Sequence, residues 1–107
     1  MFSALALVLS AGALAAPGAL HEPYRVVVRW RTASEAEMLG FHVYRQVGQR
    51  RVRLSHHLIA SLGAVSGSAY SFLDRNAPKR GVLRYWLQEV ALDGSRAWHG
   101  PIRTRSG

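Results

Sequence analysis

The alternation of apolar and polar side chains is clearest between Tyr24 and Arg31, where it predicts a β-strand. One face of this strand would carry Tyr24, Val26, Val28 and Trp30, and the other Arg25, Val27, Arg29 and Arg31. A period of two, with β-branched and aromatic residues on one side, is typical of a strand with one buried face. The arginines would project from the outer face and discourage pairing with other chains.

A second alternating run, Phe41–Arg45, predicts the next strand, with its first and third residues facing the core. Alternation is lost over residues 32–39. There, Thr32 and Glu35 have the spacing of a capping box, so we expect a single helical turn. Gly40 would then allow whatever backbone angle is needed where the chain re-enters the sheet.

Four further strands are predicted from later runs. They span residues 51–55, 68–74, 82–92 and 95–102, joined by turns or loops at 48–49, 63–67, 75–81 and 93–94. The Asp93-Gly94 pair predicts a two-residue hairpin turn, because both residue types tolerate a positive φ. Residues 56–63 fit either a helical turn or an irregular edge. About six strands at this spacing indicate an all-β sandwich.

The longest of these runs changes parity in its middle. Tyr85 and Leu87 share one face, whereas Val90 and Leu92 have the opposite parity. We expect a β-bulge near Gln88-Glu89, which would return all four side chains to the core.

The composition fits one small globular domain. The chain has 107 residues, 49% of them hydrophobic, and no cysteine, which excludes a disulfide framework and cysteine-bound metal. Its net charge of +8 comes mostly from arginines, which occur in five of the six predicted strands. Such a charge favours non-specific attraction to anionic surfaces, and we do not expect specific nucleic-acid binding.

The segment before Pro17 is apolar and uncharged. It is too short for a transmembrane helix but has the length of a signal-peptide core, with Ala13-Leu14-Ala15 as the small-residue site. We expect residues 1–15 to be a signal peptide and 16–23 a linker, and the protein to be secreted or held in the cell envelope. No basic residue precedes the apolar run, so a fragment of a larger secreted protein stays open as the alternative.

The order and spacing of these motifs resemble those of fibronectin type III-like domains of bacterial secreted and surface proteins. The matching residues are Trp30, Thr32, Glu35, Gly40, Phe41, Val43, Tyr44, Arg45, Tyr70, Phe72, Asp74, Tyr85, Leu87, Val90, Asp93, Gly94, Gly100 and Pro101. The resemblance covers residues 24–102 and implies an immunoglobulin-like β-sandwich of six to seven antiparallel strands, with 103–107 as a tail. It also implies a corner tyrosine at Tyr85, whose hydroxyl bonds nearby backbone.

This resemblance leaves the first strand unaccounted for. Sandwiches of this type have seven strands, and no clear strand precedes Tyr24. Either a very short strand forms within residues 16–23, or Tyr24–Arg31 is an exposed edge that another segment or domain completes.

No group of residues has the spacing of a catalytic or metal site. The histidines are His21, His42, His56, His57 and His99, and we interpret each as a chance surface residue. Glu35 and Asp93 are explained by their loop and turn, and Asp74 by a bond to local backbone. No nucleophile elbow and no phosphate-binding glycine loop occurs. We therefore expect no enzymatic activity, no cofactor and no metal.

Three aromatic residues are left with outward positions. Tyr44, Trp86 and Trp98 would lie on the sheet surface, together with His42 on the non-core face of its strand. An exposed surface of aromatics and arginines suits contact with a protein or carbohydrate. The alternative is that arginine side chains simply stack over these rings. We expect a non-catalytic interaction, adhesion or spacer module. A basic surface that binds nucleic acid or another polyanion is the competing hypothesis.

Overall fold

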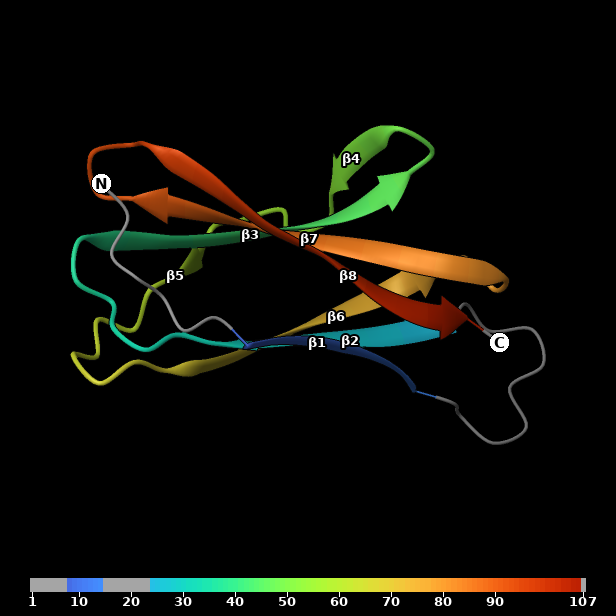
Figure 1. Cartoon of the computed structure of the whole chain (residues 1–107), viewed down its shortest axis with the longest axis horizontal. Coiled ribbons are helices and arrows are strands. Elements are labelled where there is room, and N and C mark those ends of the chain that lie inside the picture. Colours follow the sequence, from blue (N-terminus) through green and yellow to red (C-terminus); the bar gives the residue numbers. More distant parts are fainter. Residues whose placement is uncertain (1–7, 15–23, 107) are drawn as a thin grey trace.

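The computed structural model describes residues 8–14 and 24–106, and every element in them is a β-strand. The strands are β1 (Val8–Leu14), β2 (Tyr24–Arg31), β3 (Met38–Val47), β4 (Arg50–Arg53), β5 (Ile59–Ala60), β6 (Ala69–Ala77), β7 (Gly81–Ala91) and β8 (Arg96–Ser106). They form two antiparallel sheets that lie face to face (Figure 1). The predicted all-β class and its two-sheet arrangement are confirmed.

The strand order is not sequential. One sheet has the order β1-β2-β6 and the other β4-β3-β7-β8, with β5 paired to β3. Figure 1 shows β1, β2 and β6 in one layer and β3 and β7 in the other, while β8 begins beside β7 and ends close to the first layer. The chain therefore crosses between sheets after β2, and again on either side of β6, as in Greek-key sandwiches.

The apolar N-terminal segment supplies the strand next to β2. All seven residues of β1 pair antiparallel with β2, from Val8 opposite Arg31 to Leu14 opposite Arg25. Because β2 also pairs with β6, the expectation that residues 24–31 form an exposed edge is wrong. β1 occupies the edge at which completion by another segment was expected. Cleavage before Ala16 stays a prediction, and the linker at 16–23 lies outside the described residues.

The core lies between the two sheets and uses the predicted faces of β2 and β3. Its largest fully buried side chains are Trp30, Tyr85, Phe41, Leu87, Val26, Val28 and Val43. The Trp30 ring stacks on Tyr70, with centroids 5.5 Å apart, and meets Phe41 edge-on at 5.6 Å. Tyr70 and Phe72 are half-buried and pack against this cluster. Offset and edge-to-face ring pairs are favourable in addition to the apolar area that they bury.

The helical turn expected after β2 does not form. Residues 32–37 make a loop in which the Met38 amide donates to the Glu35 carbonyl, and Glu37 has a φ of 60°. Thr32 and Glu35 do meet, but the hydroxyl donates to the carboxylate at 2.8 Å. The capping-box prediction is wrong because the Glu35 carboxylate turns into the protein, toward donors of a distant loop, and not back to a helix N-terminus.

Gly40 is needed for space and not for an unusual backbone angle. It lies within β3, opposite Ala60 of β5, and its φ is not positive. A Cβ atom here would lie 2.3 Å from the Ile59 carbonyl oxygen. Only glycine therefore allows β5 to approach β3 this closely.

The bulge expected in β7 near Gln88-Glu89 is absent. Pairing with β3 continues without a shift from Val90 to Tyr85, and the irregularity of β7 lies against β8, between Tyr85 and Leu87. The prediction that four apolar residues return to the core is wrong for Leu92. Val90 is buried, whereas Leu92 is exposed.

Glu89 explains why no bulge is required. It pairs with the core residue Phe41 and is only 2% exposed. Its carboxylate lies 2.9 Å from His99 Nε2, which gives the buried acid a partner. A buried carboxylate is tolerated when it is paired, so β7 can pair regularly with β3 even though Glu89 is buried.

The hairpin between β7 and β8 forms, but its turn is longer than predicted. The Ala91 carbonyl accepts from the Gly94 amide at 2.9 Å, so Leu92 and Asp93 are the central residues. Gly94 follows with a φ of 86°, and the Ala91 amide donates to Ser95. This is a hairpin turn that ends in a left-handed glycine.

Three strands extend beyond their predicted ends, among them β3, which was predicted over residues 41–45 and spans Met38–Val47. β6 continues to Ala77, through part of the expected connection, and β8 continues past Ile102 to Ser106. The extension of β8 pairs Arg103–Ser106 with Gly81–Arg84. The turn-forming residues Asn76, Pro78 and Gly81, and the lack of apolar residues after Ile102, favoured irregular structure at these positions, whereas backbone pairing does not depend on side-chain type.

Candidate interaction face

The register of β3, β7 and β8 brings the predicted aromatic residues together. Tyr44 pairs with Trp86 across β3 and β7, and Gln88 pairs with Trp98 across β7 and β8. Because paired residues project to the same side of a sheet, these side chains share its outer face. We call Tyr44, Trp86, Trp98 and Arg51 the aromatic face.

The three rings form a contiguous cluster. Tyr44 and Trp98 have centroids 4.7 Å apart and an interplanar angle of 70°, and Trp86 and Trp98 lie 6.3 Å apart at 83°. Both are edge-on contacts, the arrangement that the ring quadrupoles prefer. Trp98 is 40% exposed, whereas Tyr44 and Trp86 are half-buried. The cluster therefore presents one prominent ring that is supported by two others.

Arg51 covers part of this cluster. The register of β4 with β3 places it opposite Gln46, on the same outer face. Its guanidinium carbon lies 3.7 Å from the Trp86 ring centroid and 4.5 Å from that of Trp98. The arginine stacking considered as an alternative thus occurs, yet it leaves Trp98 exposed. Arginine over tryptophan also presents hydrogen-bond donors beside an apolar surface.

Two glutamines hold the rings in place. The Trp86 indole donates to Gln46 Oε1 at 2.9 Å, and the Tyr44 hydroxyl donates to Gln88 Oε1 at 3.2 Å. Arg96 donates to the same Gln88 oxygen at 2.9 Å. Side chains fixed in this way lose less rotational freedom when a ligand binds, so the face is preorganised for contact.

His42 shares the side of the sheet but is not part of the accessible surface. It is 7% exposed, and its Nδ1 lies 2.9 Å from Ser55 Oγ, which also accepts the Val43 amide at 3.0 Å. The expectation of a surface histidine is therefore corrected. Burial, together with the charges of Arg53 and Arg96, lowers the pKa of His42 from its usual value of 6.5.

The lowered pKa of His42 makes stability depend on pH. The unfolded chain takes up the proton more readily, so the free energy of unfolding should fall as the pH drops below about 6.5. His42→Gln should remove this part of the dependence, while His57→Gln, at an exposed position, should leave it. Urea midpoints measured across this range check the result. An imidazole titration of His42 at or above 6.5 by NMR would contradict it.

Glu35 is the centre of a buried network that joins two loops. Its carboxylate accepts from the hydroxyls of Thr32, Ser61, Ser68 and Tyr70 and from the Ala64 amide. Burial alone raises its pKa, but the hydrogen bonds outweigh burial and lower the pKa below its usual value. The ionised Glu35 carboxylate therefore has a structural role, because it holds the two loops together. It is not part of the aromatic face, which argues against a direct part in binding.

Asp74 anchors the region between the sheets. It is 4% exposed, its carboxylate accepts a hydrogen bond from the Tyr85 hydroxyl at 2.7 Å, and it forms an ion pair with the Arg45 guanidinium. Its Oδ1 also accepts the Asn76 amide at 3.3 Å, which confirms the predicted bond to local backbone. The Tyr85 hydroxyl therefore bonds a side chain of the other sheet, and not nearby backbone as the resemblance implied. Burial, followed by the bond to Asp74, raises the pKa of Tyr85.

The remaining histidines have no common site. His56 and His57 are exposed, His99 pairs with Glu89, and His21 lies outside the described residues. Within residues 8–14 and 24–106, no three acidic or histidine side chains gather as metal ligands would. In the same part of the chain, no helix is long and apolar enough to span a membrane.

Sequence patterns predicted the three rings but missed the residues that organise them. Arg51, Gln46 and Gln88 are ordinary polar residues in the sequence, and only the strand register places them beside the rings. Comparison of the chain with protein-family models, curated proteins and solved structures found no match in any of the three.

Proposed function

We propose that the domain is a non-catalytic interaction module that binds a protein or carbohydrate through the aromatic face. The observation that carries this proposal is the half-exposed Trp98 ring, supported by Tyr44 and Trp86 and flanked by the Arg51 guanidinium. Tryptophan, tyrosine and arginine are the residue types that contribute most to binding energy at protein interfaces. Flat aromatic rings beside hydrogen-bond donors also suit the apolar faces and hydroxyls of sugars.

We further propose that the domain is fibronectin type III-like. Two features of the fold support this. With the two-residue β5 set aside, the described residues contain three strands in one sheet and four in the other, which is the seven that the resemblance implies. Trp30, Phe41, Val43 and Leu87 lie in the core, as a shared hydrophobic pattern requires.

Export to the cell envelope or surface is part of the same proposal. Its support is the apolar, uncharged N-terminal run with a small-residue site before Ala16. The fold links this to β1, because removal of residues 1–15 would take away the whole of that strand. If the chain is instead a fragment of a larger secreted protein, β1 would remain as the first strand of the sandwich.

A basic surface that binds a polyanion is the second candidate. Arg25, Arg29 and Arg31 are exposed and lie four and two residues apart along β2, on the outer side of the first sheet. A row of arginines at this spacing can follow a phosphate or sulfate backbone. This sheet lies on the opposite side of the molecule from the aromatic face, so the two candidates can be separated by mutation.

Trp98→Ala should weaken ligand binding at least about tenfold, because it removes the most exposed ring of the face. The probes are a glycan array and a displayed peptide library, with heparin and single-stranded DNA as polyanions. Binding constants of selected probes are measured by calorimetry. Leu92→Ala is the matched control, because Leu92 is an exposed apolar residue away from the aromatic face.

Two results would contradict the interaction face. One is a failure to bind any glycan or peptide. The other is binding that survives Trp98→Ala, decreases by orders of magnitude as salt is raised, and is lost on replacement of Arg29 and Arg31. The second result would establish the polyanion candidate.

A further inference from the structure

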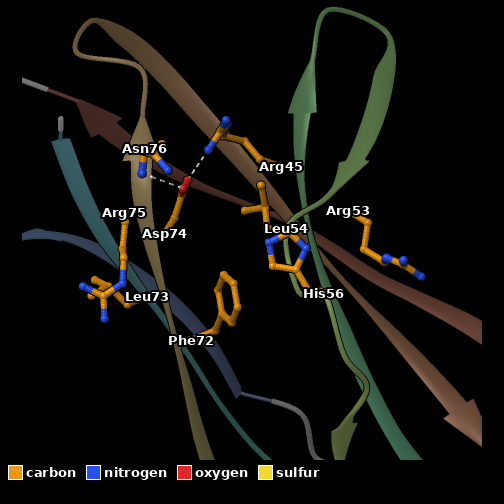
Figure 2. A pocket seen from close by; sticks show the side chains of 9 residues that line it. All are labelled: Arg45, Arg53, Leu54, His56, Phe72, Leu73, Asp74, Arg75 and Asn76. Atoms are coloured by element: carbon orange, nitrogen blue, oxygen red, sulfur yellow. Dashed lines mark hydrogen bonds and ion pairs between the residues drawn. The ribbon is translucent and has the colours of Figure 1, made fainter.

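A cavity lies between the edges of the two sheets, on the side of the sandwich where β4 and β6 face one another. Its volume is about 460 Å³. Figure 2 shows Phe72 of β6 and His56, beyond β4, projecting into the space from opposite sides. Arg53 and Arg75 extend away on the two sides of it. The cavity is at the edge of the sandwich, whereas the aromatic face is on the outer surface of β4, β3, β7 and β8; Arg53, which pairs with Tyr44, lies between the two.

The residues that line the cavity show that it follows the edge of a strand. From β6 it is lined by an unbroken run, Phe72–Asn76, and from the other side by Arg53, Leu54 and His56. Successive side chains of a strand point to opposite faces, so a cavity on one face would be lined by every second residue. An unbroken run means that the backbone edge itself faces the cavity.

This edge of β6 is open in the part of the chain that the structure describes. β6 stands at the end of the order β1-β2-β6 and pairs only with β2. The backbone N–H and C=O groups of alternate residues on such an edge are directed away from the sheet and can pair with another strand. A peptide in extended conformation could therefore continue the sheet at β6.

The chemistry of the cavity favours an acidic peptide. Its floor includes the half-buried Phe72 and Leu54, which pack against the core and offer apolar contact. Its rim carries the exposed side chains of Arg53, Arg75 and His56. The one acidic residue of the lining, Asp74, already pairs with Arg45 and accepts a hydrogen bond from Tyr85, so it does not neutralise the positive charge of the rim.

We propose that this cavity binds an extended acidic segment of another protein as an added strand on β6. Backbone pairing would supply affinity, glutamate or aspartate side chains of the segment would meet Arg75 on the outer side of β6, and the charge of Arg53 across the cavity would add attraction. Alternate apolar side chains would pack over Phe72. A second copy of this chain is a poor occupant, because its net charge of +8 would be brought against a basic rim.

The test uses the full-length chain labelled with ¹⁵N and a synthetic acetylated peptide of about seven residues, a typical strand length. Its residues alternate glutamate and valine. We expect chemical-shift changes centred on the amides of Phe72–Asn76. The double substitution of Arg53→Glu with Arg75→Glu should weaken binding at least about tenfold, which corresponds to about 1.4 kcal/mol.

A matched control has the same change in net charge at another place. Arg29→Glu with Arg31→Glu alters two exposed arginines on the outer side of β2 and should leave the affinity nearly unchanged. A peptide N-methylated at alternate residues cannot donate backbone hydrogen bonds and should bind at least about tenfold more weakly.

Three results would overturn the proposal. The first is the absence of shift changes along β6 at millimolar peptide. The second is equal affinity for the N-methylated peptide, which would show that charge alone drives binding. The third is an equal loss of affinity in the two double variants, which would show that the peptide responds to net charge and not to this rim.

Discussion

Asp74→Ala is expected to lower the free energy of unfolding by about 3–5 kcal/mol, because it leaves the charge of a largely buried Arg45 without its partner. Asp74 is 4% exposed and the Arg45 side chain 14%, so water can replace the carboxylate only in part. The Tyr85 hydroxyl, which donates to Asp74 at 2.7 Å, loses its acceptor in the same variant. Urea denaturation followed by tryptophan fluorescence measures the change.

Two companion variants separate the contributions to this network. Tyr85→Phe should cost about 1 kcal/mol, because it removes one hydrogen bond and leaves the ion pair. Asp93→Asn alters an exposed carboxylate in a turn that asparagine also favours, and it should leave the urea midpoint nearly unchanged. A loss below about 1 kcal/mol for Asp74→Ala would show that the ion pair contributes little to the fold.

Glu35→Gln is expected to lower the free energy of unfolding by about 2–4 kcal/mol, because charged hydrogen bonds are replaced by neutral ones. The carboxylate is 5% exposed and accepts five donors from residues 32 to 70. The amide has one acceptor oxygen, and its NH₂ group would face other donors. Glu37→Gln is the matched control, because this glutamate lies in the same loop and is exposed.

The same variant should change the response to acid. The pKa of Glu35 is lower in the folded protein than its ordinary value of 4.5. The folded state therefore gains stability from the ionised group above that pH, and the gain is lost as the pH falls through the folded-state pKa. Below a pH of about 4.5, the free energy of unfolding of Glu35→Gln should therefore depend less steeply on pH than that of the parent protein or of Glu37→Gln. Identical slopes would contradict the structural role assigned to this carboxylate.

Much of the fold was predictable because a strand with one buried face leaves a two-residue period in the sequence. The core faces of β2 and β3, the turn at residues 48–49 and the loop at 63–67 follow the predictions. Tyr44, Trp86 and Trp98 were expected on the outer surface, and they do meet there. Each of these features depends on neighbours that are close in sequence or on the alternation of a single strand.

The predictions that failed concern partners distant in sequence. Glu35 was interpreted through Thr32, three residues away, whereas four of its five donors come from residues 61–70. The bulge at Gln88-Glu89 was expected to return Val90 and Leu92 to the core side, whereas the strand instead places Glu89 opposite Phe41, with His99 of the next strand as its partner. Neither the contacts of Glu35 nor the pairing of Glu89 with His99 produces a pattern in the neighbouring sequence.

The sequence by itself determined that this chain is an all-β domain with arginine-bearing outer faces, because alternation and turn residues act locally. Only the tertiary structure decided that the apolar residues 8–14 pair with β2, since a short apolar run has the same appearance in a leader and in a strand. It also decided that Arg51 lies over the tryptophans and that one edge of β6 lines a basic cavity. Strand register and sheet order set those positions, and both result from the packing of the whole chain.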